Sequence, residues 1–153
     1  MKNLSRSGTL TSNWQLQRVI LGAPGKSPNP SKRHLILAVD FDGSVVENKF
    51  PEIGPTRPHA LKVLKLAKAA GHTLILWTCR CGEHLADALE WCTRNGLEFD
   101  YINSNDPRLI AYFHGDDPRK INADIYIDDK TVHGPPDWLE IADYLSRPSR
   151  WPS

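Results

Sequence analysis

Residues 34–44 read HLILAVDFDGS, and this stretch decides the fold. The apolar residues 35–39 have the length and continuity of a buried strand. Two aspartates and a glycine follow at once, and an apolar core does not hold carboxylates without partners. The strand must therefore end at Asp40, and in an open α/β sheet ligands bind at the carboxyl ends of the strands. Asp40 and Asp42 are close enough to share a site there, with Phe41 turned the other way.

Further apolar segments predict strands, and helical patterns separate them. Strands alternating with single helices predict an α/β protein with a mostly parallel, Rossmann-like sheet. Residues 45–58, rich in Pro and Gly, are expected to form an irregular flap over the acidic turn. Strands are expected at 73–77, 99–102 and 124–127. Helices are expected at 58–70, 83–95 and 136–145, with a short helical turn at 109–113.

The composition bounds the class of protein. A chain of 153 residues, 40% hydrophobic and 24% charged, fits one globular domain. A formal net charge of +1 indicates no nucleic-acid partner, and no apolar run is long enough to span a membrane. The three cysteines lie within residues 79–92; they make no disulfide framework and favour a reducing, cytoplasmic compartment.

The N-terminal segment differs in composition from the rest. In residues 1–33 every charged side chain is basic, and residues 22–32 are rich in Pro, Gly and Ser. We expect a flexible extension here, with a basic targeting peptide as the alternative. The catalytic domain is then expected at 34–147, followed by a short tail at 148–153.

Polar groups follow three of the predicted strands. Because parallel strands bring their carboxyl ends to one edge of a sheet, these groups are expected to meet there. Carboxylates this close repel one another, and a hard divalent cation such as Mg²⁺ relieves the repulsion. A helix cap or a turn is the ordinary alternative for any single aspartate. The residues are Asp40 and Asp42, then Thr78, then Asp128 and Asp129.

Each of these groups suits a step of phosphoryl transfer. Asp40 is placed to attack an electrophile, as carboxylates do in aspartyl-phosphate chemistry. Asp42, across the turn, can protonate a leaving oxygen and later deprotonate water. The backbone N–H groups around Gly43 can face an anion, and the Thr78 hydroxyl can bind a phosphoryl oxygen.

The transferred phosphoryl group also needs a cation to offset its charge. Arg119 and Lys120 lie just before the strand predicted at 124–127. The compact ammonium of Lys120 suits a point-charge role between an aspartate and a phosphate better than a guanidinium does.

Four motifs in order resemble those of the haloacid dehalogenase (HAD) superfamily. VDFDGS at 39–44 resembles the first motif, LWT at 76–78 the second, Lys120 the third and IYIDD at 125–129 the fourth. The resemblance covers residues 34 to about 145. A closer likeness to short bacterial and phage HAD hydrolases rests on the segments 51–54, 76–80, 90–92 and 123–130.

This resemblance implies a three-layer α/β sandwich and a phosphoaspartyl mechanism with Mg²⁺. Asp40 would be the nucleophile and a metal ligand, and Asp42 the acid/base, with its carbonyl oxygen on the metal. Gly43, Thr78 and Lys120 would hold the phosphate. Asp128 would bind Mg²⁺, and Asp129 would do so directly or through water. Ser44 stands where the family usually has Thr and keeps the hydroxyl. Because the dehalogenase branch lacks the second aspartate, Asp42 favours phosphate ester hydrolysis.

The intervals between the motifs leave no room for a cap domain, so the chain resembles a capless member. An open site implies a large substrate or closure by a neighbouring subunit of a homo-oligomer. The substrate can be a phosphorylated small molecule or a macromolecule. Loop residues expected near the substrate are Glu47, Glu52, Arg57, Arg80 and Asn105.

The sequence is compatible with three other interpretations. A zinc site could use Cys79, Cys81, His84 and Cys92, although their spacing fits no common ligand pattern. A receiver domain would carry its paired acids after the first strand and its phosphoacceptor after a later one. This sequence has the reverse order, with the D-x-D segment at 40–42 first and the acidic pair at 128–129 last. A HAD-fold binding or regulatory module with little or no turnover is the remaining alternative.

Overall fold

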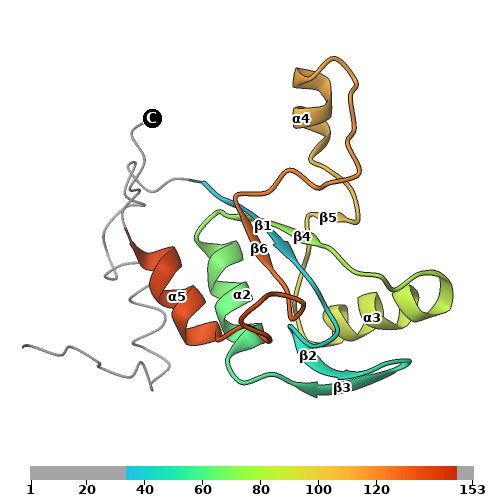
Figure 1. Cartoon of the computed structure of the whole chain (residues 1–153), viewed down its shortest axis with the longest axis vertical. Coiled ribbons are helices and arrows are strands. Elements are labelled where there is room, and N and C mark those ends of the chain that lie inside the picture. The colour runs from blue at the N-terminus through green and yellow to red at the C-terminus, as the bar shows by residue number, and fades with distance from the viewer. Residues whose placement is uncertain (1–33, 148–153) are drawn as a thin grey trace, which may run out of the picture.

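A parallel sheet lies at the centre of the protein. The structure, a computed structural model, describes residues 34–147, and the expectations for 1–33 and 148–153 lie outside this range. The strands of the sheet are β1 (Ile36–Val39), β4 (Thr73–Leu76), β5 (Tyr101–Ile102) and β6 (Ile125–Ile127). Their order is β5-β4-β1-β6, and every neighbouring pair is parallel (Figure 1). The predicted α/β class is therefore confirmed.

Three helices contribute to the core on one face of the sheet. They are α2 (Ala60–Ala69), α3 (Gly82–Arg94) and α5 (Trp138–Ser146). None of the helices in the described residues is long and apolar enough to cross a membrane. The core includes Leu37, Val39, Leu74 and Leu76 from the sheet, Val63 and Leu64 from α2, Cys92 from α3, and Trp138 and Ala142 from α5.

The second face of the sheet is covered differently. Ala38 and Ile75 from this face pack with Ile121, which lies in the segment that connects β5 at one edge to β6 at the other. The short helix α4 (Pro107–Tyr112) protrudes from this connection as an arm (Figure 1). The expected three-layer sandwich is thus seen only in part, because an extended segment covers the second face between the strands.

The segment predicted as an irregular flap is a β-hairpin instead. Strands β2 (Val46–Lys49) and β3 (Glu52–Thr56) pair antiparallel directly after the acidic turn. A Cβ atom at Gly54 would lie 2.2 Å from the Glu47 carbonyl oxygen, so the close pairing of the strands requires glycine there. The glycine that suggested irregular structure is therefore what permits the pairing.

Two element boundaries differ from expectation for local reasons. Helix α2 begins at Ala60 and not at Pro58, because His59 adopts a left-handed conformation with φ of 68°. The strand predicted at 99–102 is reduced to β5, since the Asp100 carboxylate accepts the Leu74 N–H at 2.8 Å in place of a backbone carbonyl. The other predicted strands and helices are present within one or two residues.

Candidate functional site

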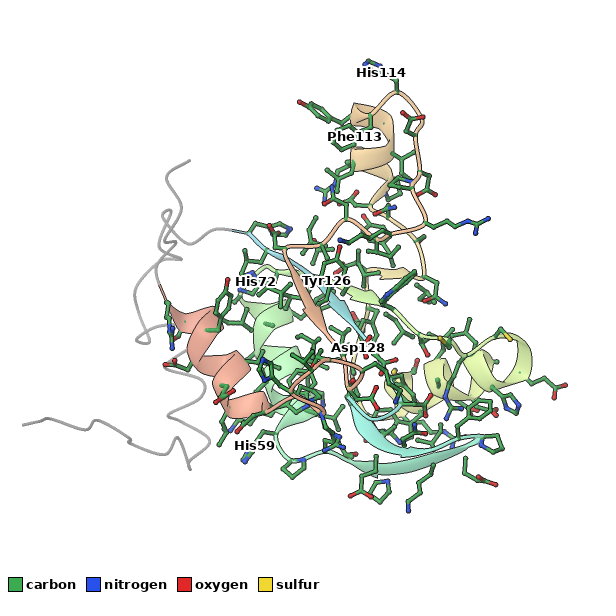
Figure 2. All side chains as sticks on the ribbon, in the orientation of Figure 1. His59, His72, Phe113, His114, Tyr126 and Asp128 are labelled. Carbon is green, nitrogen blue, oxygen red and sulfur yellow. The ribbon has the colours of Figure 1, made fainter. Side chains whose placement is uncertain are left out.

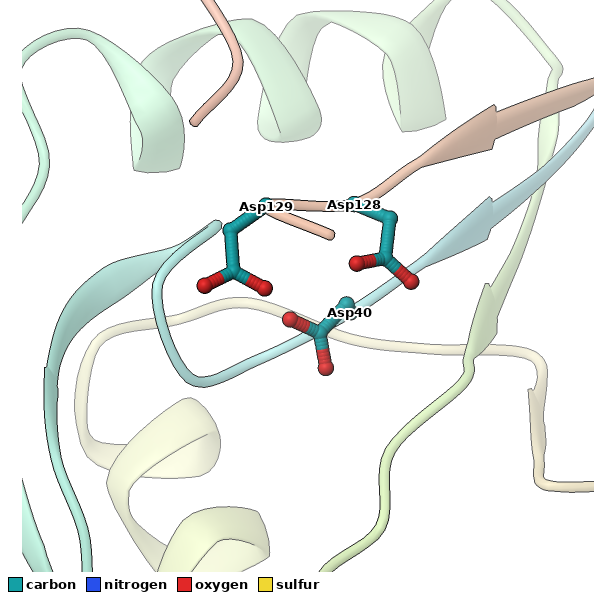
Figure 3. A group of neighbouring side chains, drawn as sticks. All are labelled: Asp40, Asp128 and Asp129. Carbon is teal, nitrogen blue, oxygen red and sulfur yellow. The ribbon is translucent and has the colours of Figure 1, made fainter. Parts of the chain in front are cut away.

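Three carboxylates converge at the carboxyl edge of the sheet. Strands β1 and β6 pair with Val39 opposite Ile127, so the next residues, Asp40 and Asp128, lie side by side. One carboxylate oxygen each from Asp40, Asp128 and Asp129 lies within 4.8 Å of the others. Figure 3 shows the three side chains turned toward a common point. The expected meeting of strand-end acids is present for these three residues.

Gly43 makes this convergence possible through its shape. Its φ is +90°, and a Cβ atom there would lie 2.2 Å from Asp129 Oδ2. Only glycine combines that backbone angle with so close an approach. The Gly43 N–H itself donates to the Val46 carbonyl at 2.8 Å, so of the N–H groups around Gly43 this one is already engaged. Gly43 is therefore a spacer that lets Asp129 approach the turn.

The Asp40 carboxyl lies in a setting that disfavours its charge. Burial raises the pKa of Asp40 to about 6, and the charges of Asp128 and Asp129 add to the rise. The Ser44 hydroxyl, which donates to Asp40 Oδ2 at 3.0 Å, opposes the shift. Ser44 is buried, and its carbonyl accepts from the Trp138 indole N–H at 2.9 Å, which ties α5 to the turn. A cation among the three oxygens would relieve this destabilised charge.

Asp42 is turned away from this cluster and is held by an arginine. The Arg80 Nε donates to Asp42 Oδ2 at 2.6 Å and Nη2 donates to Oδ1 at 2.7 Å. Arg80, expected as a loop residue near the substrate, does lie in the connection between β4 and α3, but it is only 2% exposed. Its guanidinium is committed to Asp42 and to backbone carbonyls and is not available at the surface.

Thr78 follows β4 at the same edge of the sheet. Its backbone N–H donates to Asn103 Oδ1 at 2.8 Å. Its hydroxyl oxygen accepts from the backbone N–H of Arg80 at 3.1 Å. The hydroxyl keeps its own proton for another acceptor. Thr78 therefore retains the donor that a phosphoryl oxygen would need.

Two lysines are placed differently with respect to the acidic cluster. Lys120 Nζ lies 5.5 Å from the centroid of the ring of Tyr126, an exposed residue of β6. Lys130 contacts the carboxylates directly. Its side-chain Nζ donates to Asp129 Oδ2 at 2.7 Å, and its backbone N–H donates to Asp128 Oδ1 at 2.7 Å. The hydrogen bond to Asp129 raises the pKa of Lys130.

Lys130 is the cation that sequence reasoning missed. Its signal was its position directly after the Asp128–Asp129 pair, since a turn that presents two carboxylates also brings the next side chain close. Lys120 contributes to a pocket of about 910 Å³ between α4 and β6, together with Leu109, Phe113 and Tyr126. Figure 2 shows Phe113 in the protruding arm and Asp128 near the middle of the molecule, so the far part of this pocket is remote from the acidic cluster.

The remaining expected substrate residues divide into two groups. Glu47 and Glu52 are exposed on the hairpin, and Arg57 is half-buried after β3 with no hydrogen-bond partner for its Nε. Asn105 is buried, and its side chain bonds to other residues of the connection between β5 and β6. It donates to Asp117 Oδ1 at 2.7 Å and accepts from the Asn122 backbone N–H at 2.6 Å. Its amide therefore ties the two ends of the connection that carries α4 to each other.

The alternative zinc site does not form in residues 34–147. No group of potential ligands that includes Cys79, Cys81 or His84 comes together in this range. Cys92 is buried in the core, and burial raises its pKa to about 12. Its thiol is therefore a packing group, as its place on the inward face of the helix predicted.

Comparison with known proteins supports the fold. A solved structure of a conserved protein from Bacteroides thetaiotaomicron superposes with a TM-score of 0.67 and 43% sequence identity over 74% of this chain and 90% of that chain. The chain belongs to the same family as that protein. No protein-family model and no curated protein matches the sequence.

Proposed function

We propose that the protein is a Mg²⁺-dependent phosphatase of the HAD type that hydrolyses phosphate monoesters through Asp40. The observation that carries the proposal is the convergence of Asp40, Asp128 and Asp129 beside a D-x-D turn. The HAD resemblance of the four motifs supports the same reading. The intervals between the motifs hold the β2–β3 hairpin, three helices and one short strand, which agrees with a capless enzyme.

The donor set fits Mg²⁺ on chemical grounds. All three groups are hard carboxylate oxygens, with no sulfur or imidazole among them, and Mg²⁺ prefers such ligands together with water and phosphate. Asp40, Asp128 and Asp129 would hold the ion, with the Asp42 carbonyl as the HAD resemblance implies. When bound, Mg²⁺ supplies positive charge that offsets the carboxylates and a phosphoryl group.

The residues of the chain divide the reaction between them. Asp40 attacks phosphorus, the bond to the leaving oxygen breaks, and Asp42 supplies the proton which that oxygen takes. In the second half, Asp42 takes a proton from water as the water oxygen attacks the phosphoaspartate, which releases phosphate and restores Asp40. The Thr78 hydroxyl binds a phosphoryl oxygen, and Lys120 or the newly found Lys130 balances its charge.

The test is turnover of a panel of phosphate esters with Mg²⁺ and with a chelator, beside the Asp40→Asn variant. We expect turnover that needs Mg²⁺ and that falls by ~10³-fold or more in Asp40→Asn. Asp87→Asn, an exposed acid on α3, is the matched control and should keep wild-type rates. Turnover that survives Asp40→Asn would remove Asp40 as the nucleophile, and no turnover on any ester would favour the binding or regulatory module.

A further inference from the structure

Arg80 is the most completely bonded side chain around the site. A guanidinium has five N–H donors in a fixed plane. In Arg80 two of them reach the two oxygens of Asp42, and the others reach the Pro51, Glu52 and His84 carbonyls at 3.0, 3.0 and 3.4 Å. All five donors are therefore used, and none is left for a substrate.

The surroundings of Arg80 hold its plane in place. Its guanidinium carbon lies 5.4 Å from the centroid of the Phe41 ring and 5.2 Å from that of Phe50. Phe50 in turn packs edge-on against His84 of α3 at 5.1 Å between ring centroids. Figure 1 shows the hairpin and α3 side by side at this end of the molecule. The arginine thus joins the acidic turn, the hairpin and the first turn of α3.

We propose that Arg80 is the positioning residue for Asp42, and that it couples the orientation of this carboxylate to the β2–β3 hairpin. The inference rests on the proposed phosphatase function, in which Asp42 moves the proton. A carboxylate accepts about four hydrogen bonds, so the two bonds from Arg80 orient Asp42 and leave lone pairs for a leaving group or water. Lysine cannot replace the arginine, because an ammonium does not offer two parallel donors in one plane.

Substrates with different leaving groups can show whether Arg80 positions Asp42 or only supports the fold in general. An alkoxide leaving group needs a proton, whereas a nitrophenolate departs without one. The ratio kcat/KM reports the steps up to release of this first product, so later hydrolysis of the phosphoaspartate does not enter. Loss of Asp42 positioning should therefore harm alkyl phosphates selectively.

The experiment compares Arg80→Lys with the wild type on the best alkyl phosphate of the panel and on nitrophenyl phosphate. We expect kcat/KM to fall by ~10²-fold or more for the alkyl ester and by less than about tenfold for nitrophenyl phosphate. Asp42→Asn should show the same selectivity, and adding Arg80→Lys to it should cost little more on the alkyl ester. Equal losses on both esters, or losses that multiply in the double variant, would overturn the proposal.

A second readout needs no substrate. Hydrogen exchange of the hairpin amides at 46–56 should become faster in Arg80→Lys, because the Pro51 and Glu52 carbonyls lose part of their anchor. Arg94→Lys on α3, an exposed arginine paired with Glu90, is the matched control and should leave exchange unchanged. Unchanged exchange in Arg80→Lys would overturn the coupling to the hairpin. A wild type that shows no metal-dependent turnover would instead refute the phosphatase function. The exchange measurement would still test whether Arg80 is coupled to the hairpin.

Discussion

The two aspartates of the acidic turn lie in opposite electrostatic surroundings. Asp40 shares its position with Asp128 and Asp129, and its pKa is raised to about 6 by burial and by these neighbours. Asp42, two residues on, has both carboxylate oxygens bound by the buried guanidinium of Arg80. Among the described residues, an ion pair to arginine therefore holds Asp42, and no such pair holds Asp40. The proposed function assigns this difference to a nucleophile beside a metal and an acid/base held apart from it.

The largest expected effect comes from removing the internal cation. Arg80→Ala leaves the Asp42 carboxylate, whose side chain is 15% exposed, without its partner. Breaking a buried pair in this way costs about 3–5 kcal/mol of unfolding free energy. Urea denaturation measures it, with Arg94→Ala as the control, expected within about 0.5 kcal/mol because that pair is exposed. Similar values for both variants would show that Arg80 does not anchor this part of the fold.

The next effect concerns the approach of Asp129 to the turn. Gly43→Ala places a Cβ atom against Asp129 and should cost roughly 2–3 kcal/mol, since strain at positive φ and the clash both contribute. Gly71→Ala has the same φ of +90° with nothing within 4 Å of the new atom, so it should cost only about 1 kcal/mol. Thermal unfolding with and without Mg²⁺ measures both. Mg²⁺ should stabilise Gly71→Ala and not Gly43→Ala; equal stabilisation would contradict the spacer role.

A smaller effect links pH to the metal. Because the folded-state pKa of Asp40 is raised above its ordinary 3.8 to about 6, the folded state binds more protons than the unfolded state between these values. Without metal, stability should therefore fall as pH rises through this window and level off above it. Mg²⁺ needs the ionised carboxylate, so the Tm gain from Mg²⁺ should be larger at about pH 7.5 than at about pH 5. An equal gain at both, or a pH dependence that persists in Asp40→Asn, would contradict this assignment.

The smallest expected effect on stability is that of Lys130→Met. The side chain of Lys130 is 73% exposed, and exposed ion pairs contribute little to stability, so Tm should hardly change. Mg²⁺ affinity, measured by calorimetric titration, should rise because the ammonium no longer competes for Asp129. A fall in affinity would mean that Lys130 orients Asp129 for the metal.

The acidic cluster was predictable because it depends on strand ends alone. Asp40 and Asp128 each come directly after an apolar run, and parallel pairing then places them side by side whatever the loops do. The role of Arg80 was not predictable, since in the sequence it is one polar residue in a short connection between β4 and α3. Its burial arises only when the β2–β3 hairpin packs against it, and the hairpin carbonyls that it binds lie 28 and 29 positions earlier in the chain.

The connection from β5 to β6 shows the same limit. Asn105 reads as one of several polar loop residues, yet it is buried and joins residues 12 to 17 positions away. No local pattern distinguishes an amide that will bind substrate from one that will satisfy buried backbone groups. The hairpin was missed for a related reason, because Gly54 is a breaker by local propensity and a packing requirement once Glu47 lies opposite.

The sequence by itself determined the parallel sheet, the place of each strand end and the acids that meet at its carboxyl edge. These follow from apolar periodicity and from the direction of neighbouring strands, which are local or pairwise properties of the chain. The tertiary structure alone decided that Arg80 pairs with Asp42, 38 positions away, and that no described ion pair holds Asp40. Charge pairing depends on distances of a few ångströms between segments far apart in sequence, and only the folded packing sets those distances.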